Sequence, residues 1–337
     1  MQLEEGTIIQ HKYTIHRRIG KGSFGSVFEV RRLEDGERLA LKTILCSDLE
    51  DNMVRQAFRE ATIMKRIHLL DERGEEVVFP WIVPIFDFWA DEVFGSGIYI
   101  CMIMELVSGP SLEAYIERLV HPRMKCRSTG GFSRVRPGEE LSDDDENVLQ
   151  IHPEMVYRWI SQIILGLSVI HKLKVVHRDI KPANLILSVD LKSIKLADFS
   201  VSRVFEPNET SLDTSAGTVQ YSSPELLQGK AYNEATDMFS LGCVLYEILT
   251  LEKVFKVANT AKILSMVARG EVPSVPDDNE PGLVMICNRL MSTDPTRRPS
   301  SRILCDHPRL KPYVTTEMGN INCIEIRRAI INFLNFT

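Results

Sequence analysis

The sequence lacks any arrangement of cysteines that could hold a metal or a disulfide framework. Seven cysteines are spread through 337 residues, their number is odd, and no Cys-x-x-Cys pair occurs. This pattern argues against a zinc ribbon and against a disulfide-rich secreted scaffold. We therefore expect reduced thiols and a cytoplasmic protein, with the nucleus as an alternative location.

Long apolar runs are also absent. The stretch Ile98–Val107 is interrupted by Glu105, whereas a membrane-spanning helix needs about 20 consecutive apolar residues. The first residues, MQLEE, lack the basic and apolar regions of a signal peptide. The formal net charge of -6 disfavours nucleic acid as the main partner. The sequence thus predicts a protein that engages neither membranes nor nucleic acids.

The N-terminal part of the chain has a mainly strand-like pattern. Alternation of apolar and polar residues begins at Tyr13, and Asp35-Gly36 is a hairpin-turn signal between two strand-like segments. After this hairpin, the pattern predicts a helix over 52–68, a loop over 70–77, and strands over 82–89 and 97–105.

From Glu113 onward the pattern is mainly helical. The clearest helices are expected over 153–172 and 236–250, where apolar residues recur at helical spacing. Before them, the segment 120–150 is basic in its first half and acidic in its second, with little that could form a core. We interpret it as a disordered insertion, and favour a solvated linker over a docking segment.

A glycine-rich motif occupies residues 20–27, GKGSFGSV, and fits the pattern GxGxxGxV. Glycines let backbone amides approach phosphate oxygens without a Cβ in the way. A dinucleotide-binding fingerprint would need a helix directly after the glycines and an acidic residue about 20 positions on. Here a strand follows and Lys42 stands at that distance, so an NAD-binding oxidoreductase is disfavoured.

Lys42 lies two residues after Ala40, so both side chains face the same side of their expected strand. A lysine among apolar residues costs free energy unless it has an anionic partner. Glu60, a carboxylate on the apolar face of its expected helix, poses the same problem with the opposite sign. We expect the two to pair; the alternative is two unrelated charges that reach solvent.

Residues 177–184, HRDIKPAN, fit the pattern HRDxxxxN at every defined position. In this pattern Asp179 orients the substrate hydroxyl, Lys181 neutralises charge on the transferred phosphoryl group, and Asn184 holds magnesium. Downstream, Asp198 in the sequence ADFS supplies further oxygen ligands of the kind that Mg²⁺ prefers.

Together these motifs resemble the eukaryotic protein kinase family over residues 13–310. Asp237 matches the aspartate that braces the catalytic loop in this family, and Arg298 matches the arginine that pairs with Glu225. The resemblance implies an α+β bilobal fold, with ATP and Mg²⁺ as cofactors. It assigns nucleotide contacts to Gly20, Gly22, Gly25, Val27, Ala40, Lys42, Met104, Glu105, Val107 and Ile186.

The same resemblance gives the expected domain organisation and the substrate class. Lys181 and Gly217-Thr218 resemble the serine/threonine branch, and the stretch 249–276 is similar to NIMA-related kinases, so the implied partners are proteins with serine or threonine acceptors. The implied units are an N-terminal extension (1–12), a β-rich N-lobe (13–107), a helical C-lobe (108–310) with the insertion, and a C-terminal tail (311–337). The stretch 321–337 is expected to pack on the large lobe as a short helix, with a partner site as the alternative.

Two chain-specific features bear on activity and regulation. Ser200 replaces the glycine of the family's Asp-Phe-Gly motif, which leaves a pseudokinase scaffold as the alternative to an active enzyme. All metal ligands of the motif are retained, so we favour the active enzyme. The resemblance also implies activation by phosphorylation of Thr214, with Arg178 and Arg203 as ligands of the phosphate. Ser211 and Ser215 are alternative sites, and an upstream kinase is the implied second partner.

Overall fold

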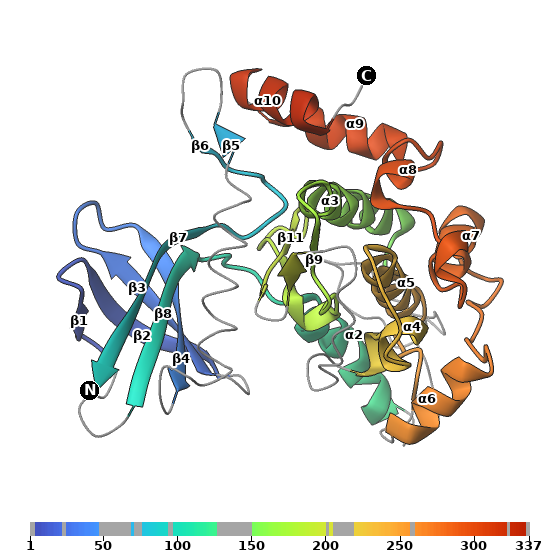
Figure 1. Cartoon of the computed structure of the whole chain (residues 1–337), viewed down its shortest axis with the longest axis horizontal. Coiled ribbons are helices and arrows are strands. Elements are labelled where there is room, and N and C mark those ends of the chain that lie inside the picture. The colour runs from blue at the N-terminus through green and yellow to red at the C-terminus, as the bar shows by residue number, and fades with distance from the viewer. Residues whose placement is uncertain are drawn as a thin grey trace.

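Two lobes of different composition make up the structure (Figure 1). The computed structural model describes residues 4–21, 25–46, 69–70, 76–93, 97–126, 150–199, 202–204, 219–256, 260–321 and 324–334. A curled β-sheet forms the first lobe and helices form most of the second, so the expected bilobal α+β architecture is confirmed. No helix in the described part of the chain is long and apolar enough to cross a membrane.

The small lobe is built on one sheet with the strand order β1-β2-β3-β4-β8-β7, antiparallel throughout. The expected hairpin turn joins β3 to β4, and Gly36 has a φ of 75° there, a conformation that glycine adopts without strain. The strand expected over 97–105 is confirmed, whereas the one expected over 82–89 begins at Ile85. The strands are β1 (Ile8–Ile9), β2 (Tyr13–Lys21), β3 (Gly25–Arg32), β4 (Arg38–Cys46), β7 (Ile85–Val93) and β8 (Gly97–Glu105).

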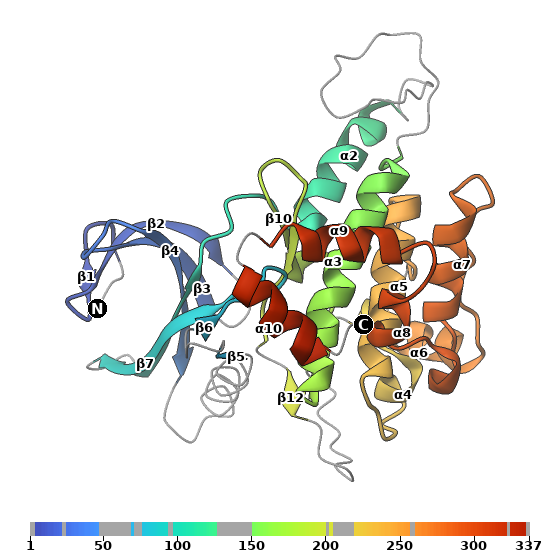
Figure 2. The ribbon, with the colours of Figure 1, turned by 90° about the horizontal axis from the view of Figure 1, so that it is seen from above.

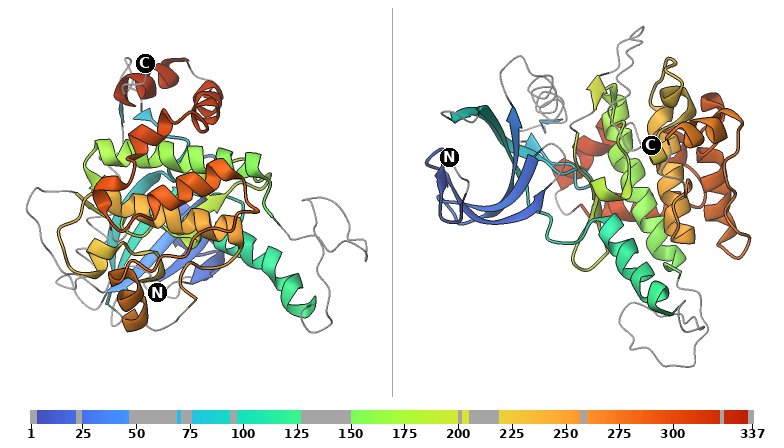
Figure 3. Two further views of the ribbon diagram at one scale, coloured as in Figure 1. Left: turned by 90° about the vertical axis from the view of Figure 1, so that its right-hand side faces the viewer. Right: turned by 90° about the horizontal axis from the view of Figure 1, so that it is seen from below.

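The sheet curls until strands from its two edges meet (Figures 1 and 3). Tyr13 of β2 stacks on Trp89 of β7 with ring centroids 6.1 Å apart, although these strands are not neighbours in the sheet. The side chain of Gln10 also donates a hydrogen bond to Asp91 at 3.1 Å. This closure buries one face of the sheet around a small core that includes Val30 and Leu41. The opposite face, which carries Ala40, is turned to the cavity between the lobes.

The connection between the expected helix over 52–68 and β7 differs from the prediction. We expected a loop over 70–77, but its ends pair antiparallel as β5 (Leu69–Leu70) and β6 (Glu76–Val77). The apolar residues at both ends suit strand pairing, and the turn-prone residues that dominated the prediction lie between them. The expected helix itself lies outside the described residues.

Helix α3 (Pro153–Lys172) is the centre of the large lobe, with the bounds that the sequence predicted. Pro153 stands at the first turn, where its missing N–H costs nothing. From Val156 to Ile170 the side chains are buried apart from that of Arg158, and α3 contacts α8, α9 and β11. The other elements of this lobe are β9 (Val175–Val176), β10 (Leu185–Leu187), β11 (Ile194–Leu196), β12 (Arg203–Val204), α4 (Pro224–Leu227), α5 (Ala235–Thr250), α6 (Thr260–Ala268), α7 (Pro281–Leu290), α8 (Ser301–Cys305), α9 (Lys311–Gly319) and α10 (Ile324–Leu334), with short 3-10 turns at Pro182–Asn184, Val219–Tyr221 and Pro295–Arg297.

Helix α2 (Leu112–Cys126) corrects the start of the expected insertion. We placed the insertion at about 120–150, but the helix continues past residue 120 and projects from the large lobe (Figure 2). Leu119 and Val120 pack against the main core, so the helix is still held by burial at the residue where we expected the insertion to begin. The rest of the segment, residues 127–149, lies outside the described residues.

The chain passes from β8 to α2 through a connection that is held against β10. The amide of Leu187 donates to the carbonyl of Pro110 at 2.9 Å, and Ser111 forms a β-bridge with Ile186. A Cβ on Gly109 would lie 2.0 Å from the carbonyl oxygen of Leu187, so this close approach requires glycine. The connection between the lobes is therefore fixed to the strand beneath the cavity.

The C-terminal helix α10 packs back on the large lobe, as expected for the stretch 321–337. Lys172 of α3 donates to the carbonyl of Phe333, and Arg302 of α8 donates to the carbonyl of Leu334 at 3.3 Å. The ring of Phe333 lies 5.9 Å from that of Phe79, which follows β6, and α10 contacts β6 itself (Figure 1). A C-terminal helix on the large lobe thus meets the extended connection of the small lobe.

Replacing Phe333 by alanine should lower stability, because the partly buried ring contacts both Phe79 and Lys172. We expect Phe333→Ala to cost about 2 kcal/mol, roughly half of a fully buried phenylalanine. The exposed neighbour Asn332 gives the matched control, Asn332→Ala, which should change stability little. Thermal and urea unfolding would measure both variants, and equal midpoints for the two would contradict a stabilising role for the helix.

Candidate active site

A cavity of about 1110 Å³ lies between the lobes, below the small-lobe sheet and above β10. Its apolar roof is formed by Val27 and Ala40, and Ile186 lies on the side of the large lobe. The connection after β8 closes one end. Of the residues expected to contact nucleotide, the cavity is lined by Gly20, Val27, Ala40, Lys42, Met104, Glu105, Val107 and Ile186.

The glycine-rich motif is described only in part. Gly22 lies outside the described residues, and Gly25 does not line the cavity. A Cβ on Gly25 would lie 1.7 Å from the carbonyl oxygen of Thr43, so this glycine is required by the close packing of β3 on β4. A Cβ on Gly20 would meet nothing nearer than 3.7 Å. The steric demand for glycine at position 25 therefore comes from the sheet.

Lys42 of β4 points into the cavity and reaches the metal-ligand candidate of the large lobe. Its Nζ lies 2.8 Å from Oδ1 of Asp198, and only 14% of its side chain is exposed. The expected partner Glu60 lies outside the described residues, so that pairing stays a prediction. The contact with Asp198 joins the two lobes within the cavity, which both residues line.

The loop that contains Asp179 brings three of the expected side chains together. Asn184 donates from Nδ2 to Oδ2 of Asp179 at 2.8 Å, and Lys181 donates to the same carboxylate at 2.6 Å. Asn184 also donates to the backbone carbonyl of Asp179 at 2.9 Å. The carboxylate of Asp179 is thereby held in one orientation, with a cation beside it.

Asp237 of α5 holds this loop in place. Its carboxylate accepts the backbone amides of His177 and Arg178, both at 2.8 Å, and a hydrogen bond from His171 at 2.9 Å. Complete burial alone would raise the pKa of Asp237, but the hydrogen bond and charge of His171 and the amide of Arg178 outweigh it and lower the pKa. Asp237 thus stays ionised and satisfies two successive amides.

Two residues of the site have left-handed backbone conformations that are rare for side chains other than glycine. Arg178 has a φ of 68° and Asp198 a φ of 63°. Each costs on the order of 1–2 kcal/mol and persists only where the surroundings enforce it. For Arg178, the hydrogen bond from its amide to Asp237 supplies this constraint. For Asp198, the next residue along the chain, Phe199, is held by its ring, whose centroid lies 4.6 Å from that of His177.

The residues expected to regulate the enzyme are described only in part. Thr214 lies outside the described residues, and so does Ser200. Arg203 pairs in β12 with Val176 of β9, which leads into Arg178 two residues later. The guanidinium of Arg178 is buried and lies 5.5 Å above the ring of Tyr232. The structure therefore brings together the segments that contain the two arginines.

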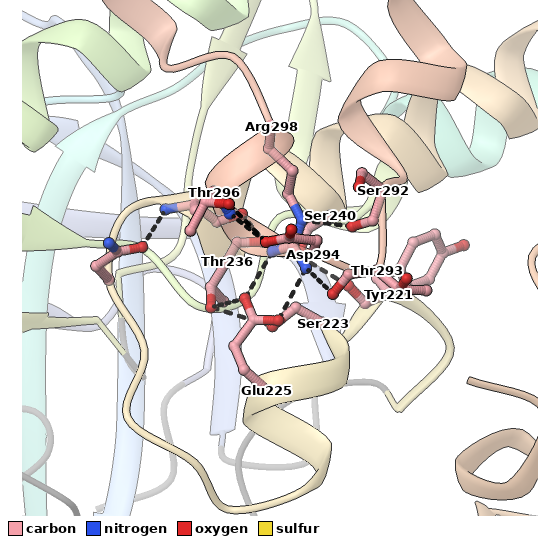
Figure 4. Close-up of polar contacts among 12 residues, drawn as sticks. Tyr221, Ser223, Glu225, Thr236, Ser240, Ser292, Thr293, Asp294, Thr296 and Arg298 are labelled. Atoms are coloured by element: carbon pink, nitrogen blue, oxygen red, sulfur yellow. Dashed lines mark hydrogen bonds and ion pairs between the residues drawn. The ribbon is translucent and has the colours of Figure 1, made fainter. Parts of the chain in front are cut away.

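A buried ion pair fixes the end of the segment that follows Thr214 (Figure 4). Arg298 donates to both carboxylate oxygens of Glu225, at 2.6 and 2.8 Å, and Thr236 donates to the same carboxylate at 3.0 Å. Burial alone would raise the pKa of Glu225, but Arg298 outweighs it and lowers the pKa. Stability from this pair is therefore present at neutral pH and is lost as the pH falls through the lowered value.

Sequence reasoning missed several charged residues that line the cavity or contact a residue that lines it. Lys195 of β11 donates to both oxygens of Glu105, at 2.6 and 2.5 Å. The buried Glu29 accepts from Arg17 at 2.9 Å and from Arg38 at 2.7 Å, and the hydrogen bond from Arg38 is the largest cause of its lowered pKa. Alternation along the strands could have located these residues. Glu29 follows Val27 by two positions and so lies on the same face of its strand, and Lys195 stands between two buried residues and so points the other way.

These features define a protein kinase, and comparison with known families agrees. The protein kinase domain model matches residues 13–310, and the chain belongs to that family. The expected resemblance to NIMA-related kinases is also confirmed, because relatives of this chain are serine/threonine-protein kinases with Nek names.

Three relatives give the extent of this similarity. Serine/threonine-protein kinase Nek6 of Oryza sativa subsp. japonica is 28% identical over 303 residues, covering 90% of this chain and 48% of the relative. Probable serine/threonine-protein kinase nek2 of Dictyostelium discoideum is 31% identical over 292 residues, covering 86% and 60%. Nek11 of Mus musculus is 28% identical over 320 residues, covering 94% and 44%. The chain spans about half the length of the curated relatives it matches, and none of these comparisons supports the pseudokinase alternative.

Removing Arg298 should destabilise the large lobe strongly. Arg298→Met leaves the buried carboxylate of Glu225 without its cation, which we expect to cost about 3–5 kcal/mol. The adjacent Arg297 is 79% exposed, so Arg297→Met should change stability by less than about 1 kcal/mol.

Adding Glu225→Gln to Arg298→Met should recover part of the loss, since it removes the uncompensated charge. Urea unfolding at neutral pH would compare these variants with the wild type. Similar losses for Arg298→Met and Arg297→Met would contradict the assigned importance of the pair.

Proposed function

We propose that this protein transfers the γ-phosphoryl group of ATP to serine and threonine hydroxyls of other proteins, with Mg²⁺ as cofactor. The observation that carries the proposal is a set of complementary groups: Lys42, Asn184 and Asp198 line the cavity, and Asn184 also holds Asp179. Lys42 reaches Asp198 from the small lobe, and Asp179 is held by Lys181 and Asn184 in the large lobe. Phosphoryl transfer depends on this kind of positioned charge more than on covalent chemistry by the protein.

The residues of the cavity suit both the nucleotide and the metal ion. Val27, Ala40 and Ile186 provide apolar surfaces above and below a flat base. Nδ2 of Asn184 donates to Asp179, so Oδ1 of Asn184 remains as an oxygen ligand, and the carboxylate of Asp198 lines the same cavity. Such oxygen donors suit Mg²⁺, which when bound supplies positive charge that offsets the charge of the phosphate oxygens.

Each polar residue then has a separate task. The carboxylate of Asp179 orients the substrate hydroxyl and accepts its proton, in an orientation fixed by Asn184. Lys181, 2.6 Å from Asp179, places a cation where charge on the transferred group develops. Lys42 supplies a cation for the α- and β-phosphates. Burial keeps the pKa of His177 low, so the neutral ring can pack against Phe199 and hold the loop.

The decisive comparison is wild type against Asp179→Asn in one purified assay with labelled ATP, Mg²⁺ and a generic protein substrate. We expect Asp179→Asn to lose at least about a hundredfold in rate, since the base and its orientation are lost together. Asp190→Asn is the matched control, because Asp190 is exposed in the turn between β10 and β11. Its rate should equal that of the wild type.

Retention of thermal stability by Asp179→Asn would exclude unfolding as the cause of its loss. Background phosphate transfer that is the same in the wild type and in Asp179→Asn would overturn the proposed activity. Serine, threonine and tyrosine peptides in the same assay would test the acceptor class.

Regulation through phosphorylation of Thr214 by an upstream kinase is the second part of the proposal. Support comes from the sequence spacing and from the pairing of β12 with β9, which brings the segment of Arg203 next to that of Arg178. A phosphate accepts from both arginines and orders the segment between Asp198 and Glu225.

Thr214→Ala should therefore lower activity by about tenfold or more, while leaving the unfolding midpoint unchanged. Phosphatase treatment of the wild type should give the same loss, and mass spectrometry should find the phosphate on residue 214. Ser215→Ala is the matched control in the same segment. Full activity of Thr214→Ala without any phosphate in this segment would show that the regulation is different.

A further inference from the structure

An ion pair between Glu105, which lines the cavity, and Lys195 joins the two lobes, in addition to the contact between Lys42 and Asp198. Glu105 is the last residue of β8 in the small lobe, and Lys195 is the middle residue of β11 in the large lobe. Nζ of Lys195 donates to Oε1 and Oε2 of Glu105, at 2.6 and 2.5 Å. The two side chains are only 19% and 32% exposed. A two-fold contact that is partly shielded from water holds its partners more firmly than a surface pair.

The lysine end of this pair is anchored on both sides. The amide of Leu196 donates to the carbonyl of Trp81, and its carbonyl accepts the amide of Val83, both at 2.9 Å. In the β10–β11 hairpin, Lys195 stands opposite Ile186, which lines the cavity. The same strand leads to Asp198 within three residues. Lys195 therefore projects from a strand whose position relative to the floor of the cavity and to Asp198 is fixed.

The glutamate end belongs to the connection that closes the cavity. Glu105 stands opposite Leu39 in the sheet, and its amide donates to the carbonyl of Pro84 at 3.2 Å. After Glu105 the chain leaves the sheet, and residues 106–110 line the cavity before Gly109 meets β10. The sheet holds the connection at Glu105, and β10 holds it at Gly109. The ion pair with Lys195 adds a direct side-chain contact between the start of the connection and the large lobe.

We propose that Lys195 is a positioning residue for nucleotide binding: by holding the carboxylate of Glu105, it fixes the backbone of residues 105–107 at a set height above Ile186. This inference rests on the proposed function. A flat base binds more tightly when the surfaces above and below it and the connection at its edge are already correctly spaced, because binding then carries little entropic cost of ordering the protein. Loss of the ion pair should weaken ATP binding more than it slows phosphoryl transfer, since Asp179 and its partners are held separately by Asp237.

The central experiment is steady-state kinetics of Lys195→Met, with nucleotide affinity measured directly by a fluorescent ATP analogue. We expect KM for ATP and the dissociation constant to rise about fivefold or more, with kcat within about twofold of the wild type. Lys192→Met is the matched control, because Lys192 is exposed in the same hairpin and takes no part in the pair. Its KM and kcat should equal those of the wild type.

Two further variants separate positioning from general stability. Lys195→Arg keeps the charge and should retain most of the affinity. The charge exchange Glu105→Lys with Lys195→Glu should bind ATP more tightly than either single replacement, because it re-forms an ion pair across the same gap. Thermal unfolding of the same variants completes the separation, because a lysine that merely stabilises the fold would lose affinity only in step with stability.

The outcomes are distinct. A KM for Lys195→Met within twofold of that of Lys192→Met would overturn the inference, and so would a parallel loss of affinity, kcat and thermal stability. Failure of the charge exchange to improve on both single variants would also overturn it. A wild type that neither binds the nucleotide nor transfers phosphate would instead overturn the proposed function, and this inference with it.

Discussion

The catalytic region depends on one buried carboxylate. Asp237 is fully buried, so its charge must be satisfied by protein donors, and it takes them from His171 and from the amides of His177 and Arg178. Two successive amides can meet one carboxylate only if the backbone turns sharply, which is consistent with the positive φ of Arg178. The orientation of Asp179, the next residue, follows from this turn. The hydrogen bonds that stabilise the buried charge of Asp237 thereby also set the geometry of the loop that contains Asp179.

The same logic recurs where segments far apart in the sequence have to meet. Lys42 with Asp198, Lys195 with Glu105 and Arg298 with Glu225 each join two elements by a shielded ion pair. The first two pairs join the small lobe to the large lobe, whereas the third joins two segments within the large lobe. Because a partly buried charge is costly without its partner, each pair specifies one arrangement of its elements more than it adds stability.

Several elements lie at the edges of that framework. Helix α2 projects beyond the core at its far end, and the β5–β6 hairpin meets α10. Phe333 and Phe79 form the contact between a C-terminal helix and a connection of the small lobe. No described residue of the β5–β6 hairpin or of α10 lines the cavity, whereas α2 contributes Leu119 to its lining.

Local patterns in the sequence determined the lobes, the bounds of α3 and β8, and the motifs that contain Asp179, Asn184 and Asp198, because periodicity and short motifs are properties of neighbouring residues. They did not determine how far α2 extends or that the ends of the loop over 70–77 pair, because tertiary burial and strand pairing decide both. The ion pair between Lys195 and Glu105 could not be predicted from local patterns either, because the two residues are 90 positions apart in the sequence. Alternation along a strand shows which way a side chain points, but only the packing of the lobes decides which charge it meets.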